Sequence, residues 1–177
     1  PASVAGNAPD NPGPEAKDVP SDYWAREAIE MLSEHRIMQG YRGYFRPDDY
    51  ITRAEFCALI NRAFGYFKKA EVSAFRDAGN DPDDWKDDAI MKASYQGYLE
   101  GSGGYAYPDR SITREEAMVI LARVLRKEPA TGNTSFIDDN DISEWAKPLL
   151  VTLWKEGYIR GSGGRLNPKD NISRAEA

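Results

Sequence analysis

Ile51-Thr52-Arg53-Ala54-Glu55-Phe56 is the stretch that decides the fold of this chain, because related sequences stand at two later places. The second copy is Ile112-Thr113-Arg114-Glu115-Glu116-Ala117, and the third is Ile172-Ser173-Arg174-Ala175-Glu176-Ala177. A proline and a glycine precede each copy at fixed distances: Pro47 and Gly40, Pro108 and Gly101, Pro168 and Gly161. Self-similarity with a period of about 60 residues indicates a repeat protein. The chain therefore consists of three copies of one unit.

The start of a helix is predicted inside each copied stretch. Thr52 and Glu55 have the spacing of a capping box, in which each side chain bonds the backbone N–H of the other residue. The same spacing recurs in Thr113 with Glu116 and in Ser173 with Glu176. Apolar residues follow at helical spacing, so amphipathic helices are expected from Arg53 and Arg114 onward. A third helix would begin at Arg174, but few residues remain for it, and we expect the native chain to continue.

An earlier helix is also predicted in each unit. Its expected N-caps are Asp22, Asp83 and Ser143. Each of these helices carries one tryptophan: Trp24, Trp85 and Trp145. A tryptophan at helical spacing with alanine and isoleucine is more often a core residue than a binding platform, so we expect these side chains in the core. The glycines that open the following returns are expected to end the helices in a left-handed conformation: Gly40, Gly101 and Gly161.

Arginine occupies the first helical position of each copied stretch, as Arg53, Arg114 and Arg174. The helix dipole disfavours a cation there by roughly 0.3–1 kcal/mol. Three arginines at one repeat position therefore suggest an anionic partner for each, either a protein carboxylate or a bound ligand, and one guanidinium can serve both. Glu115 stands directly beside Arg114 and predicts that the second arginine is neutralised. We thus expect Arg53 and Arg174 to contribute more to binding.

The acidic composition limits what the chain binds. The net charge of −6 argues against nucleic acid, and no apolar run is long enough for membrane insertion. The single cysteine, Cys57, is expected to be a small buried hydrophobe. The acidic run 77–88 lacks the ligand order of a calcium loop, so neither a metal nor a cofactor is expected. The repeat singles out no nucleophile with a base, and enzymatic activity is not expected.

The order of the motifs predicts a mainly α fold made of helix-loop-helix units. Residues 1–17 are rich in proline and read as a flexible tail. The three units are expected over residues 18–65, 75–126 and 136–177, joined by short connectors. A unit of about 60 residues is marginal by itself, so we expect the three to pack into one compact body.

Together these motifs resemble a triplet of S-layer homology domains. The first unit carries Asp18-Val19, Trp24-Ala25, Gly40-Tyr41, Pro47-Asp48 and the stretch from Ile51 to Glu55. The other two open with Phe75-Arg76-Asp77 and Trp85, and with Phe136-Ile137-Asp138 and Trp145-Ala146. The resemblance covers residues 16–177. It implies a pseudo-threefold arrangement of the repeats around a central helical bundle.

The resemblance also implies a function. Members of the family anchor surface proteins or exported enzymes non-covalently to an anionic cell-wall polysaccharide, commonly a pyruvylated one, in grooves between repeats. By resemblance, the acid group would meet Arg53, Arg114 and Arg174. Sugar hydroxyls would be held, or those arginines oriented, by Asp18, Asp77 and Asp138. The groove wall would contain Trp24, Trp85 and Trp145, and the backbone would approach the saccharide at Gly40, Gly101 and Gly161.

Two functions of different classes stay open at this point. The first is an extracellular carbohydrate-binding anchor at the bacterial cell wall. The second is a structural module that meets protein partners or self-associates in a surface layer. Hydrolysis of the polysaccharide is a third, which no motif of the repeat favours.

Overall fold

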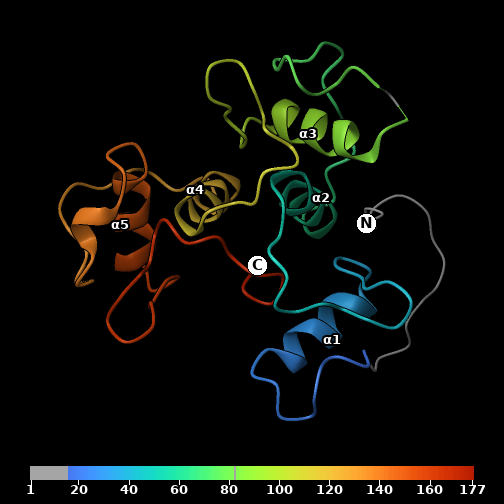
Figure 1. Cartoon of the computed structure of the whole chain (residues 1–177). Coiled ribbons are helices and arrows are strands. Elements are labelled where there is room, and N and C mark those ends of the chain that lie inside the picture. Colours follow the sequence, from blue (N-terminus) through green and yellow to red (C-terminus); the bar gives the residue numbers. More distant parts are fainter. Residues whose placement is uncertain (1–15, 82) are drawn as a thin grey trace. The chain divides into compact units, whose positions relative to one another are not determined.

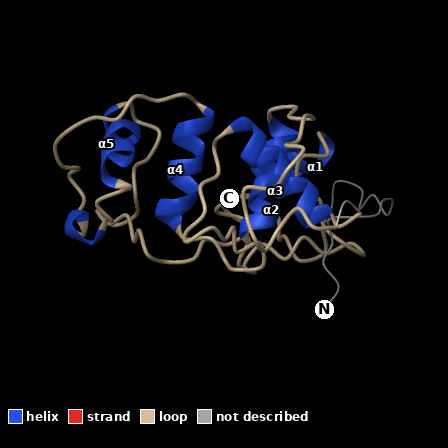
Figure 2. Cartoon of the chain, turned by 90° about the horizontal axis from the view of Figure 1, so that it is seen from above, coloured by secondary structure: helices blue, strands red, loops and turns tan. Residues whose placement is uncertain are grey.

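The computed structural model describes residues 16–81 and 83–177, so residues 1–15 of the predicted tail lie outside the described part. The described chain consists of helices and loops with isolated β-bridges and no strand (Figure 2). Its helices are α1 (Arg26–Glu34), α2 (Arg53–Ala63), α3 (Trp85–Gln96), α4 (Arg114–Val124), α5 (Lys147–Lys155) and the 3₁₀ helix η1 (Asp139–Asp141). The predicted mainly α fold is confirmed.

The second helix of a sequence repeat begins where the capping box predicts. The Thr52 hydroxyl accepts a hydrogen bond from the Glu55 N–H at 3.2 Å, and the Glu55 carboxylate accepts one from the Thr52 N–H at 2.9 Å. Thr113 and Glu116 form the same box at the start of α4. Ser173 and Glu176 also form it, at 2.9 and 3.3 Å, although the sequence ends one residue later. The box is therefore a local structure that does not need the full helix.

The first helix of a unit begins later than predicted, and the expected caps Asp22, Asp83 and Ser143 are wrong. α1 and α5 begin after an alanine with no side-chain cap. The N–H of Arg26 is instead satisfied by the Tyr23 carbonyl oxygen at 3.0 Å. The cap of α3 is Asp84, one residue after the predicted one, whose carboxylate accepts from the Lys86 N–H at 2.8 Å.

Left-handed residues end the first helices, but they are not the predicted glycines. Gly97 ends α3 with φ 74°, and the equivalent positions after α1 and α5 are Arg36 (φ 56°) and Gly157 (φ 79°). After α5, the N–H groups of residues 157 and 158 bond back to the carbonyls of residues 154 and 153, which satisfies the end of the helix.

Gly40 and Gly101 have a different role, since neither has a positive φ. A Cβ at Gly40 would overlap the carbonyl oxygen of Tyr44, and a Cβ at Gly101 would overlap that of Tyr105. Both glycines lie at the base of a tight hairpin whose ends pair through one β-bridge. They are required for close backbone approach within the loop.

Helices pack across the boundaries of the sequence repeats. α2 of the first repeat packs against α3 of the second, and α4 of the second packs against α5 of the third (Figure 1). The chain divides into two compact units: the described residues up to Ser111 with Ser173–Ala177, and Ile112–Ile172. The boundary between them falls inside the second repeat, so the compact units are out of phase with the sequence repeats.

Each unit has an apolar core of its own. In the first, the buried Tyr98 hydroxyl donates to the Asn61 side chain at 2.8 Å, and the Asn61 amide donates to the Ala89 carbonyl at 3.0 Å. Cys57 is fully buried here, as predicted, and burial raises the pKa of its thiol to about 12. The core of the second unit consists of Val119, Ala122, Phe136, Ile142, Ala146, Leu150, Leu153, Ile159 and Leu166.

Replacing the left-handed arginines by glycine is expected to stabilise the protein. Arg36 (φ 56°) and Arg126 (φ 52°) stand where other repeats have Gly157 and Gly65. Arg36→Gly and Arg126→Gly should each raise the free energy of unfolding by about 0.5–1 kcal/mol, because the Cβ strain is removed. Urea unfolding followed by circular dichroism measures this. Gly157→Ala is the reciprocal control and should lower stability, and a loss of stability in Arg36→Gly would contradict the interpretation.

Candidate functional site

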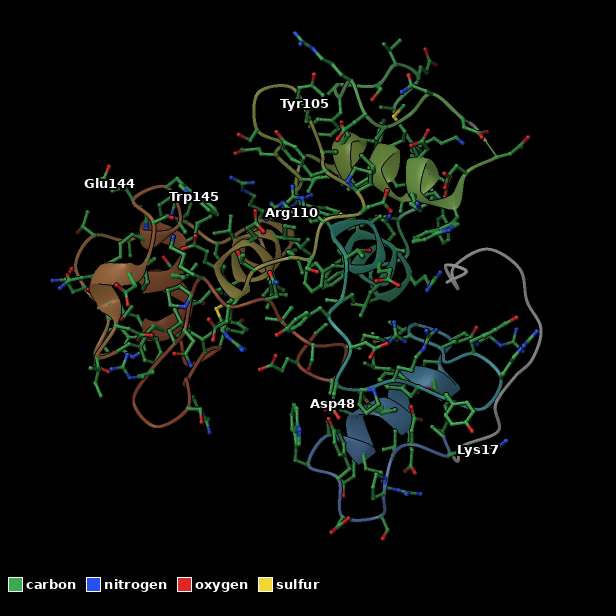
Figure 3. The ribbon with its side chains drawn as sticks, viewed as in Figure 1. Lys17, Asp48, Tyr105, Arg110, Glu144 and Trp145 are labelled. Carbon is green, nitrogen blue, oxygen red and sulfur yellow. The ribbon has the colours of Figure 1, made fainter. Side chains whose placement is uncertain are left out.

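The start of each second helix binds the loop of a different repeat through its backbone. The first N–H groups of a helix have no partner inside the helix. At the start of α2, the Arg53 N–H donates to the Arg110 carbonyl at 2.9 Å, and the Ala54 N–H donates to the Pro108 carbonyl at 3.0 Å. The first repeat is thereby joined to the loop of the second. Figure 3 shows Arg110 on this loop, which also carries Tyr105.

The same backbone contact occurs at the other two copies of the motif. In the second unit, the N–H groups of residues 114 and 115 donate to the carbonyls of Asp170 and Pro168 at 2.9 and 3.0 Å. In the first unit, the N–H groups of residues 174 and 175 donate to the carbonyls of Asp49 and Pro47, both at 2.9 Å. The second repeat thus meets the third, and the third meets the first.

Two of the predicted arginine side chains extend this contact in matching ways. The Arg53 Nε donates to the Ala106 carbonyl at 2.7 Å, and its Nη2 donates to the Glu100 carbonyl at 3.2 Å. The Arg174 Nε donates to the Phe45 carbonyl at 2.9 Å, and its Nη2 donates to the Gln39 carbonyl at 3.1 Å. Backbone carbonyls were not among the partners expected from the sequence.

The guanidinium of Arg174 is half-buried and is held by backbone carbonyls. Burial lowers its pKa, the charge of Glu55 opposes this shift and the charge of Arg46 adds to it, although an arginine keeps its proton at neutral pH. Its other close contact is the Phe45 ring, 4.9 Å from the guanidinium carbon. Within residues 16–81 and 83–177, no carboxylate oxygen lies within the 4.0 Å of an ion pair with Arg174. The charges of Glu55, Asp49 and Asp18 therefore act on this arginine from beyond ion-pair distance.

The three predicted aspartates hold the loops that these arginines contact. The Asp18 carboxylate accepts from the N–H groups of Phe45 and Arg46 at 2.8 and 2.6 Å. Asp77 accepts from residues 106 and 107 at 2.7 and 2.8 Å, and Asp138 accepts from residues 166 and 167 at 2.9 and 2.7 Å. In the first two of these pairs, the first residue also accepts a hydrogen bond from an arginine. The Phe45 carbonyl accepts from Arg174, and the Ala106 carbonyl accepts from Arg53. Asp18 and Asp77 therefore position Arg174 and Arg53 through the loop backbone.

The residue before each proline is strained, a feature that the sequence reading missed. Arg46, Tyr107 and Asn167 have φ of 58°, 54° and 53°, in the left-handed region that side chains rarely adopt. Each donates its N–H to the aspartate of its own repeat, which offsets the strain. The only sequence signal is their shared place before Pro47, Pro108 and Pro168.

The tryptophans do not form the predicted core. Trp24 and Trp145 have exposed fractions of 71% and 54%, and Trp145 lies on the segment before α5 beside Glu144 (Figure 3). Both precede their helices, because α1 and α5 begin two residues later than the tryptophan. Trp85 is half-buried at the start of α3, where it lies near the end of α2 instead of near Arg53.

Glu115 has a different role from the one predicted. It is buried, with an exposed fraction of 4%, and it accepts from the Ser143 N–H and hydroxyl at 3.0 and 2.9 Å. The Lys169 ammonium lies 2.6 Å from its carboxylate and also bonds Ser143. Nothing in the sequence pattern indicates that Glu115 pairs with a residue 54 positions later. The charge of Glu115 is thus balanced by Lys169 of the third repeat. Glu115 therefore does not neutralise Arg114, contrary to the prediction from the sequence.

The acidic run 77–88 is occupied by loop and cap contacts. Asp87 accepts from the N–H groups of Asn80 and Asp81, both at 2.8 Å, and Asp84 caps α3. The described part of the chain contains no cluster of three or more ligands suited to a metal ion. Nor does any helix in that part have the length and apolarity to cross a membrane.

This chain combines a threefold sequence repeat with helix starts that join each repeat to another, which defines a class of tandem helical repeat domain. The family model of the S-layer homology domain matches residues 17–57, 74–118 and 140–177. The matches cover more than half of the chain, and the chain belongs to the S-layer homology domain family. This membership confirms the resemblance, supports a role in cell-wall anchoring and indicates a location at the cell surface.

Relatives share this segment within much longer proteins. An amylopullulanase of Thermoanaerobacterium thermosulfurigenes is 36% identical over 88% of this chain and 9% of the relative. The exoglucanase XynX of Acetivibrio thermocellus is 37% identical over 88% of the chain and 15% of the relative. A surface-layer 125 kDa protein of Lysinibacillus sphaericus is 30% identical over 86% of the chain and 13% of the relative. The chain thus spans a small part of each, and the shared part accompanies proteins of different kinds.

Glu115 and Lys169 are expected to depend on each other for stability. In the first repeat the equivalent of Glu115 is Ala54, and the second-repeat equivalent of Lys169 is Asp109. Glu115→Ala should lower the free energy of unfolding by about 1–3 kcal/mol, because Ser143 and Lys169 lose their buried acceptor. Lys169→Asp should cost more, since it brings two carboxylates together.

The double variant Glu115→Ala/Lys169→Asp reproduces the first-repeat pattern and should recover most of the loss. Urea unfolding of the two single variants and the double variant measures the coupling. Losses that simply add would show that the pair does not act together.

Acid is expected to destabilise the third repeat through Asp138. Burial alone would raise the pKa of Asp138, but the N–H groups of Leu166 and Asn167 outweigh it, and the pKa is lowered. A lowered folded pKa means that the stabilisation is present above the unfolded pKa of about 3.9 and is lost as pH falls through the folded pKa. Unfolding free energies measured from pH 7 to about pH 2.5 should fall less steeply in Asp138→Asn, and an unchanged slope would contradict this.

Proposed function

We propose that the chain anchors its parent protein to the bacterial cell wall by binding an anionic, pyruvylated polysaccharide between neighbouring repeats. The groups that would meet the acid are the guanidinium groups of Arg53, Arg114 and Arg174. Each stands at the first position of a capped helix or helical turn, at a contact between two repeats. The three sites are related by the sequence repeat.

One observation carries the proposal: Arg174 is a half-buried cation held by backbone carbonyls and an aromatic ring, and no carboxylate of the described residues lies within ion-pair distance of it. A partly buried cation without a direct ion pair gains from a close anionic partner, so such a site favours an anionic ligand. A carboxylate suits the planar guanidinium, which can donate two parallel hydrogen bonds. An acidic protein that binds an acidic polymer needs local cations of this kind, because its overall field repels the polymer.

The other predicted site residues take supporting roles in this proposal. Asp18, Asp77 and Asp138 fix the loops on which the arginines rest, so they orient the cations and leave the sugar hydroxyls to other groups. The exposed rings of Trp24 and Trp145 are available to a sugar face. Gly40, Gly101 and Gly161 keep the hairpins tight beside the arginines.

The proposed anchor is a binding module and not an enzyme. It works through the equilibrium affinity of several equivalent contacts, which together hold a polymer more firmly than one contact does. Enzymatic activity in a longer protein would then reside in segments outside this chain.

Arg174→Ala is expected to weaken binding of a pyruvylated wall disaccharide by at least about tenfold, which corresponds to about 1.4 kcal/mol. Calorimetric titration measures this, with the same sugar lacking the pyruvyl group as the ligand control. Arg126→Ala, which removes an exposed arginine beyond the end of α4, is the protein control and should bind as the unaltered chain does.

Equal affinity for the two sugars would exclude recognition of the acid group. Absence of binding to both, by a chain that includes a complete third repeat, would overturn the proposal. It would favour the structural alternative, in which these surfaces meet other proteins or copies of the chain in a surface layer.

A further inference from the structure

A cavity of about 260 Å³ lies between the last turns of α2 and the first turns of α3, within the first compact unit. Ala58 and Ala89 form part of its wall, and the side chains around it come from both helices and from the segment after α2. Arg53 opens α2 whereas Arg62 lines this cavity, and nine residues of helix span about 13 Å. The cavity is therefore separate from the arginine contact at the start of α2.

Three aromatic rings line this cavity. They belong to Tyr66, Phe67 and Trp85. Tyr66 is held in place, since its ring stacks on Phe64 with centroids 5.9 Å apart. Phe67 has an exposed fraction of 84%, the largest among the exposed apolar side chains of the described chain. An aromatic ring so exposed beside a cavity contributes little to the core and is suited to contact a ligand.

Charged groups also line the cavity. Asp88 accepts from Lys92 at 2.6 Å and from Lys69 at 3.4 Å, so its carboxylate is fixed at the rim. Arg62 donates to the Ile37 carbonyl at 3.3 Å, and no carboxylate of the described residues lies within ion-pair distance of it. Donors and an acceptor thus surround a small space that aromatic faces also border.

The fold does not require this cavity, as the corresponding place between α4 and α5 shows. There the residue equivalent to Ala89 is Leu149, and the equivalent of Asp88 is Pro148. The aromatic pair is replaced by Lys127 and Glu128, and Lys127 forms an ion pair with Glu156 at 2.5 Å. The aromatic and charged lining at the junction of α2 and α3 is therefore not repeated at the junction of α4 and α5.

We propose that this cavity binds a pyranose ring of a polysaccharide through its apolar face and its hydroxyl groups. The C–H face of the ring packs on Trp85 and Phe67, while neighbouring hydroxyls donate to Asp88 and accept from Lys92 and Arg62. A volume of 260 Å³ suits one or two sugar rings. An aliphatic peptide side chain would fit less well, because it would desolvate Asp88 and Lys92 without replacing their hydrogen bonds.

This site goes beyond the proposed acid recognition, because its lining requires no pyruvyl group. The probe is therefore the wall disaccharide without its pyruvyl group. Its titration is followed by the NMR signal of the Trp85 indole N–H, assigned with Trp85→Phe. We expect a saturable shift of that signal, while the signal of Trp154, which packs against the core of the second unit, stays unchanged.

Two variants introduce into the cavity the residues that stand at the equivalent places of the α4–α5 junction. Ala89→Leu introduces the side chain found at position 149 and fills the space, and Phe67→Glu introduces the residue found at position 128. Each should weaken binding of the probe by about tenfold or more, because contact with an aromatic face is lost or blocked. Phe67→Glu changes an exposed side chain, so it tests the site without altering the core.

Arg174→Ala separates this inference from the proposed function, since it should leave binding of the uncharged probe unchanged. A folded protein whose Trp85 signal does not move would overturn the inference. So would Ala89→Leu and Phe67→Glu variants that bind the probe as the unaltered chain does. Loss of the pyruvylated ligand in Arg174→Ala with an unaffected Trp85 shift would support both sites independently.

Discussion

The paired hydrogen bonds from one aspartate to two successive loop N–H groups are the interaction on which the rest of this structure depends. Asp77 holds residues 106 and 107, and the carbonyl of residue 106 then receives Arg53 from another repeat. The carboxylate also offsets a left-handed residue before the proline, which a free loop would avoid. Without this contact the loop has no fixed carbonyl to offer, and the helix start loses its partner.

Because helix starts and loops join different repeats, the sequence repeat is not the packing unit. α2 packs with α3 and α4 with α5, and the compact units divide the chain inside the second repeat. A repeat of about 60 residues cannot bury its helices alone, so its stability comes from its neighbours. Each junction between repeats can therefore carry features of its own. Glu115 and Lys169 pair at one junction, and the aromatic cavity lies at another.

The arginines illustrate how a residue can serve structure and binding together. Arg53 and Arg174 each use Nε and Nη2 to hold a loop of another repeat. A guanidinium has five N–H donors, and at Arg174 the loop uses only Nε and Nη2. Burial beside carbonyls makes the cation rigid and poorly hydrated, which favours a carboxylate over water as its next partner.

The sequence by itself determined the local structures. The capping boxes at Thr52, Thr113 and Ser173 need only neighbouring residues, and so the helix starts at Arg53 and Arg114 were predictable. Tertiary structure decided the partners: the loop carbonyls at the arginines, the loops held by Asp18, Asp77 and Asp138, and the link from Glu115 to Lys169. It also decided that Trp24 is exposed, since helical spacing says which residues share a face and not what covers that face.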